Sequence, residues 1–122
     1  MHKQTNISGE ASTTLFALEE VSGAAVRGYA GERIGTIDRL LFDRHSGRVA
    51  FAIVDVETGI EGDERQVSIP WGKLQFDTEN GGFSANVTAE QIEHAPQYGA
   101  EEPSRVWERR SLDYFRQPYY WA

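Results

Sequence analysis

The chain has 122 residues, a length that corresponds to a single domain. It contains no cysteine, which excludes disulfides, thiolate nucleophiles and cysteine-ligated zinc and fits a reducing compartment. Its 19 acidic and 12 basic side chains give a net charge of −7, which disfavours binding to nucleic acid. The longest apolar run, residues 49–54, is too short to span a bilayer, and no signal peptide opens the chain. We therefore expect a cytoplasmic protein.

The first 57 residues predict an arm, a lead-in strand and a hairpin. Residues 1–14 are polar without an apolar period, which predicts a disordered arm. Short apolar pairs separated by glycine predict a strand around residues 24–29. Two β-rich runs, RIGTIDRLLFD and RVAFAIVDVE, then predict a hairpin. Asp43 can begin its turn by accepting hydrogen bonds from the following backbone, and Gly47 can adopt the positive φ that closes it.

The second arm of this hairpin is apolar at every position from Val49 to Val54. Val49, Phe51 and Ile53 share one face, and the alanines between them share the other with Val54. A strand that is apolar on both faces needs cover on both. A barrel interior supplies one cover, and a helix, a terminal arm or a second subunit must supply the other. A buried helix is the rival interpretation, which the flanking turn and the β-branched residues disfavour.

The segment RQVSIPW reads as a strand that ends on a proline. Val67 and Ile69 share a face with Trp71, whereas Pro70 has no N–H to donate and ends the pairing. Trp71 can then plug the barrel end. The following segment KLQFDTENGGFSANV predicts a second hairpin that turns through residues 80–82.

Two helices are predicted after the second hairpin. Thr88 precedes Gln91 by three residues, a capping-box spacing, and Pro96 stops this short helix after one or two turns. Pro103 suits the first turn of a longer helix and Pro118 its end. We divide the chain into an arm at 1–14, a barrel domain at 15–99, and a C-terminal helix with an aromatic tail at 100–122.

Three motifs resemble those of the PRC-barrel domain, the small β-barrel shared by the photosynthetic reaction-centre H subunit and the C-terminal half of a ribosome maturation factor. Gly31 to Gly35 resembles the family's G-x-x-I/L-G strand opening. Asp43 to Arg48 resembles its D-x-x-T/S-G-R/K turn, with Gly47 as the turn glycine, and Val67 to Leu74 resembles its V-P/I-V-P-W-x-x-L segment, which contains Pro70 and Trp71. The resemblance covers residues 24–98 and points to stand-alone members of the family.

The resemblance implies a mainly β fold, a small PRC-type barrel of five to six antiparallel strands with a short helix and a C-terminal helix. It also implies a protein-interaction module, not an enzyme. The two other functions that it suggests are an RNA-processing or ribosome-maturation factor and a peripheral component of a photosynthetic or electron-transport membrane complex.

The polar residues offer little chemistry. His2, His45 and His94 are scattered without a metal-ligand spacing. The acidic residues between Asp55 and Glu64 lie on a glycine-rich loop and could hold calcium, but their spacing does not fit an EF-hand, so we expect a solvated loop. No cofactor is implied.

Three further groups of residues are candidates for catalysis or phosphate binding. Ser46 follows His45 directly, and side chains of neighbouring turn residues point apart. Asp38 and Asp43 flank a strand, with nothing in the sequence to raise either pKa. The glycines at 31 and 35 lack the spacing of a phosphate loop. We therefore expect no enzyme.

Aromatic residues are concentrated in the C-terminal segment. Because each can bury about 150–250 Å², the segment needs a surface to pack against. It can cover the strand at 49–54, or it can dock onto a partner or a second copy, since tyrosine and tryptophan are enriched at interface hot spots. The candidate contact residues are Trp107, Tyr114, Phe115, Tyr119, Tyr120 and Trp121.

The C-terminal segment can also be interpreted from its helical spacing and from its charge. Val106, Trp107, Ser111, Tyr114 and Phe115 recur near helical spacing, with Arg110 inside the stripe. Arginines interleave with the aromatics as in RNA binders that stack bases, and also as on a solvated helix face. We expect another protein as the partner and a homodimer as the assembly, because the strand at 49–54 needs further apolar cover and the tail is aromatic. The charge disfavours nucleic acid.

Overall fold

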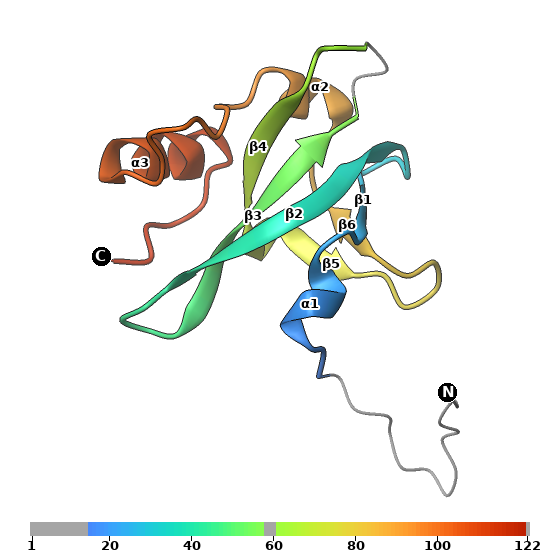
Figure 1. Cartoon of the computed structure of the whole chain (residues 1–122), viewed down its shortest axis with the longest axis horizontal. Helices are drawn as coiled ribbons and strands as arrows, with labels where there is room; N and C mark the ends of the chain where they lie inside the picture. Colours follow the sequence, from blue (N-terminus) through green and yellow to red (C-terminus); the bar gives the residue numbers. More distant parts are fainter. Residues whose placement is uncertain (1–14, 58–60, 122) are drawn as a thin grey trace, which may run out of the picture.

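The computed structural model describes residues 15–57 and 61–121, so the predicted arm at 1–14 lies outside the described residues. Six strands form one curled sheet in the order β4-β3-β2-β1-β6-β5 (Figure 1). The strands are β1 (Ala25–Arg27), β2 (Arg33–Asp43), β3 (Arg48–Val56), β4 (Arg65–Pro70), β5 (Leu74–Phe76) and β6 (Phe83–Ala85). The helices are α1 (Leu18–Val21), the 3₁₀ turn η1 (Trp71–Lys73), α2 (Ala89–Glu93) and α3 (Arg105–Tyr114). The predicted mainly β, barrel-type fold is confirmed.

One strand pair differs from the expected antiparallel arrangement. β1 pairs with β2 antiparallel on one edge and with β6 parallel on the other. The β5–β6 hairpin therefore joins the sheet through β6, which pairs with the edge of β1 opposite β2. Local sequence predicts hairpins because their strands are adjacent in the chain, whereas this pairing joins segments more than 50 residues apart and is decided by packing.

The β2–β3 hairpin follows its prediction. Asp43 accepts hydrogen bonds from the backbone N–H groups of His45 and Ser46, at 3.4 and 3.1 Å. Gly47 has a φ of 75°, a conformation that glycine adopts without steric cost. The turn is therefore closed by the two residues that the sequence assigns to it.

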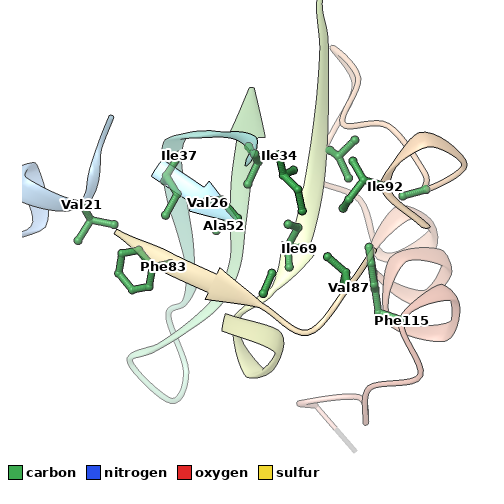
Figure 2. Close-up of a cluster of buried hydrophobic side chains, with 14 residues drawn as sticks. Val21, Val26, Ile34, Ile37, Ala52, Ile69, Phe83, Val87, Ile92 and Phe115 are labelled. Atoms are coloured by element: carbon green, nitrogen blue, oxygen red, sulfur yellow. The ribbon is translucent and has the colours of Figure 1, made fainter. Parts of the chain in front are cut away.

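The main core lies inside the curl of the sheet (Figure 2). Ala52 and Val54 of β3 and Val67 and Ile69 of β4 point into it and are fully buried. Trp71 packs against the same cluster, with its ring centroid 5.7 Å from that of Phe83. Pro70 is the last residue of β4, and Trp71 begins the 3₁₀ turn η1.

A second core covers the outer face of β3. Phe51 and Ile53 pack there against Trp107 and Leu112 of α3, and all four are at most 3% exposed. The face that we expected to need a helix, an arm or a second subunit is thus covered by the chain's own C-terminal helix. This arrangement removes the uncovered strand as a reason to expect a dimer, and the homodimer itself stays a prediction.

α2 ends before Pro96 as predicted, whereas Pro103 precedes the cap of α3 and does not lie in its first turn. Thr88 and Gln91 form both bonds of the capping box, at 3.1 and 2.8 Å. α3 begins after its cap Ser104 and ends at Tyr114, where Arg116 follows in a left-handed conformation before Pro118 is reached.

The buried face of α3 differs from the predicted stripe. Its buried residues are Trp107, Ser111 and Leu112, followed by the cap Phe115, whereas Val106 is 62% exposed. These four positions lie on one side of a helix with 3.6 residues per turn, and Val106 is rotated by about 100° from Trp107. Arg110 is exposed and does not interrupt the stripe.

Candidate interaction surface

The predicted contact aromatics mostly pack on their own chain. Trp107 and Phe115 are each 3% exposed, the former beside Phe51 and Tyr98 with ring centroids 4.8 and 5.1 Å away. Phe115 belongs to the main core. Tyr114 is 37% exposed, and its hydroxyl donates to the backbone oxygen of Gln91 at 2.6 Å. Two of the six residues are therefore core residues and unavailable to a partner.

The last three described residues are held against α3 by their side chains. The Tyr119 hydroxyl donates to Asp113 at 2.6 Å, and the Tyr120 hydroxyl donates to Glu108. The Trp121 ring stacks on Tyr119 with 4.8 Å between centroids. Burial, and then the bond to Glu108, raises the pKa of Tyr120, so this hydroxyl stays protonated and donating at neutral pH. The tail is thus an intramolecular cover with half-exposed rings.

Two hollows lie between this tail and the β2–β3 hairpin, and Ala50 and Tyr120 line both. The first has a volume of about 320 Å³, with the aromatic rings of Phe42, Phe51 and Trp107 in its wall. The second has a volume of about 540 Å³ and is lined mainly by apolar residues. Its apolar lining residues are Val49, Ala50, Pro70, Trp71, Leu112 and Pro118.

Arginine side chains lie around the two hollows. Arg44 and Arg105 line the first hollow and Arg48 lines the second, and all three are exposed. The hairpin turn and α3 lie on the same side of the molecule, with the C-terminal segment between them (Figure 1). We call the surface made by residues 43–48 and 103–121 the arginine-rich end.

Charge is distributed very unevenly between this end and the rest of the chain. The arginine-rich end has six of the 12 basic residues but three of the 19 acidic ones, a balance of +3. All other residues carry −10, which together with +3 gives the net −7. The six are Arg44, Arg48, Arg105, Arg109, Arg110 and Arg116, and the three are Asp43, Glu108 and Asp113.

The C-terminal arginines are evident in the sequence, but their proximity to the hairpin turn is not. Phe42 is 65% exposed because a register shift at Leu41/Phe42 turns it out of the alternation of β2. The signal in the sequence is the turn segment FDRHSGR, which joins an aromatic to two arginines. That this turn and α3 line the same hollow is decided by tertiary packing.

Asp38 and Asp43, the candidate acid–base pair, both form structural contacts. Asp38 accepts from Arg39 at 2.8 Å and from Gln66 at 3.2 Å. Hydrogen bonds from Ser46 and the N–H of His45 lower the pKa of Asp43. The lowered pKa keeps this carboxylate charged at neutral pH, whereas a general acid needs a raised pKa to hold its proton there.

The acidic loop is tied to arginines. Glu57 pairs with Arg33 at 3.1 Å, and Asp63 pairs with Arg65 at 3.3 Å. These four side chains line a further hollow of about 330 Å³ beside α2, where cations and anions already face one another. Among the described residues, no three histidine, aspartate or glutamate side chains are grouped as metal ligands. Residues 58–60 of this loop lie outside the described residues.

We predict that Asp43→Asn lowers stability at neutral pH but not in acid. Because the folded-state pKa of Asp43 lies below its ordinary 3.8, its charge stabilises the fold above that pH, and this stabilisation is lost as the pH falls through the folded-state value. Denaturant unfolding of both proteins between pH 7 and pH 2.5 measures this. A stability difference that is independent of pH would contradict the prediction.

We predict different outcomes for two C-terminal truncations. A chain ending at Pro118 loses only half-exposed rings and should stay folded, with a melting temperature lower by roughly 5–10 °C. A chain ending at Asp113 also loses the buried Phe115 and should not fold stably at 37 °C. Circular dichroism with light scattering checks both. Equal stability of the two truncated chains would show that Phe115 is not a core residue, and a halved mass on removal of 119–122 would make the tail an assembly element.

The comparisons with known proteins agree with the fold. The PRC-barrel domain family matches residues 13–92, most of the chain. The protein therefore belongs to the PRC-barrel domain family. A relative from Deinococcus radiodurans, described as an uncharacterized protein, is 28% identical over 80 residues. That match covers 66% of this chain and 28% of the relative's length. No helix among residues 15–57 and 61–121 is long and apolar enough to cross a membrane.

Proposed function

We propose that the protein is a non-catalytic protein-interaction module that acts in the cytoplasm and binds its partner at the arginine-rich end. The observation that carries this proposal is the mainly apolar second hollow next to a first hollow that exposed Phe42 lines together with arginines. Such concave apolar surfaces with aromatic anchors and arginines are typical of interface hot spots.

Photo-crosslinking tests the proposal. The full chain with a photoreactive phenylalanine at position 42 is expected to give a discrete crosslinked protein in its native cells. The control places the same group at Tyr29, which is 76% exposed and outside the arginine-rich end. Equal crosslinking at both positions, or none at position 42, would contradict binding at this end.

We also propose that the protein self-associates, through a surface other than the arginine-rich end. Phe16 and Phe76 touch with centroids 4.8 Å apart and are 47% and 44% exposed, beside Leu18, which is 72% exposed. This patch, formed by the segment that leads into α1, the first residue of that helix and β5, gives a second copy an apolar surface to bury. Light scattering at tens of micromolar should give twice the mass of one chain, and Phe76→Ser should reduce it; a monomer would contradict the dimer.

An RNA-associated function is the second candidate, because six arginines at one end lie among aromatic rings. It is opposed by the −10 carried by the rest of the chain. Salt-sensitive RNA binding that requires these arginines would favour it over protein binding.

A further inference from the structure

We propose that the arginine-rich end binds an acidic segment of a partner protein, whose apolar side chains enter the two hollows while its carboxylates pair with Arg44, Arg48 and Arg105. This inference rests on the proposed function and adds the chemistry of the partner. It follows from three features of this end: free positive charge, a fixed arginine, and apolar side chains that line the hollows.

The positive charge is free because the nearby carboxylates are already occupied. Asp43 accepts from two backbone N–H groups of its own turn. Glu108 accepts from the Tyr120 hydroxyl and lies 3.6 Å from Arg105. Within residues 15–57 and 61–121, Arg44 and Arg48 form no ion pair. An acidic ligand therefore does not have to displace an internal partner from these two guanidinium groups.

Arg105 is held in place before any partner arrives. Its guanidinium lies 3.7 Å from the centroid of the Trp121 ring, and that ring stacks on Tyr119. A guanidinium fixed over an aromatic ring loses less conformational entropy when it pairs with a carboxylate. The aromatic tail thus orients a binding residue in addition to covering α3.

The second hollow combines a mainly apolar lining with an arginine, and the first places aromatic side chains among polar groups and two arginines. Phe42, Phe51 and Trp107 line the first hollow together with Arg44 and Arg105. Trp71 and Leu112 accompany Arg48 in the second. A segment in which acidic and apolar residues are interspersed matches both features, because carboxylates meet guanidinium groups while apolar side chains leave water.

The rings of this end favour a protein over a nucleic acid. Base stacking needs free aromatic faces. The Trp121 ring already has Tyr119 stacked on it and Arg105 over it, and the Tyr120 ring contacts Phe51 and Trp121 edge-on. The strongly acidic remainder of the chain also repels an extended phosphate backbone.

The test is selection from a phage-displayed library of random twelve-residue peptides on the immobilised full chain. We expect enriched peptides rich in aspartate and glutamate around leucine, isoleucine or phenylalanine. The best peptide, made synthetically, should bind at least tenfold more weakly to Arg44→Glu/Arg48→Glu. It should also weaken as salt rises. The matched control Arg33→Glu/Lys73→Glu makes the same charge change outside the arginine-rich end and should alter affinity less than twofold.

Other results overturn the inference. These are neutral or basic enriched peptides, no enrichment, or equal weakening by the control pair. RNA binding by the full chain that the Arg44→Glu/Arg48→Glu change abolishes would assign this end to nucleic acid. A mass that falls from dimer to monomer on the same change would assign it to the acidic surface of a second copy. If crosslinking at position 42 succeeds while the peptide results fail, the proposed function stands and only the acidic partner is wrong.

Discussion

Replacement of Gly35 by alanine is expected to destabilise the fold by about 3 kcal/mol or more, because the site has no space for a methyl group. A Cβ at this position would lie 2.0 Å from the carbonyl oxygen of Asp55 and 3.1 Å from the Cα of Val56. Both atoms belong to the backbone of β3, which pairs with β2 there. The strands must separate locally, and hydrogen bonds between them would be lost.

The matched control is Gly99→Ala, which has no atom within 4 Å of the new Cβ and no positive φ. It should change stability by less than about 0.5 kcal/mol. Denaturant unfolding of the two variants beside the parent measures the difference. If Gly35→Ala costs no more than Gly99→Ala, the β2–β3 approach at Gly35 is not as close as described, and the glycine would be required for another reason.

Replacement of Trp107 by alanine is expected to cost about 3–5 kcal/mol, because it empties the space between α3 and the outer face of β3. The ring is 3% exposed and contacts Phe51 and Tyr98. Trp107→Phe should cost less, about 1–2 kcal/mol, because it keeps a ring and removes a buried indole N–H that lacks a hydrogen-bond partner among the described residues.

Val106→Ala is the control for Trp107, since Val106 is its neighbour on α3 and is 62% exposed. Its replacement should change stability by less than about 0.5 kcal/mol. Thermal and denaturant unfolding of the three variants check the order. A loss below about 1 kcal/mol for Trp107→Ala would mean that α3 is not a core element, and the dimer explanation for the covered face of β3 would regain its basis.

Local patterns in the sequence were sufficient for the hairpins and caps. Asp43 and Gly47 predict the turn because its hydrogen bonds and its positive φ involve residues a few positions apart. The Thr88–Gln91 capping box is predicted for the same reason. The four-residue helix α1 was not predicted, because so short an apolar segment has no helical period to detect.

The candidate surface was predicted only in part. Its C-terminal aromatics were identified, but half-exposed Tyr120 and buried Phe115 carry the same sequence signal, so exposure could not be assigned. Burial of Ser68 and Ser111 illustrates the same limit. Their hydroxyl oxygens lie 3.0 Å apart between β4 and α3 and form a buried hydrogen bond. The sequence pattern by itself places a serine at either position in solvent or in apolar contact, and it does not predict this pair.

The amino-acid sequence by itself determined the strands, the turns, the family resemblance and the acidic net charge, because each depends on residue type and on neighbours close in the chain. Tertiary structure decided that β1 and β6 pair in parallel, that α3 covers β3, and that Arg44 and Arg48 join the C-terminal arginines at one end. These outcomes depend on which apolar faces, far apart in the chain, pack against one another and are removed from water. Local sequence does not specify that packing, because it involves the entire core.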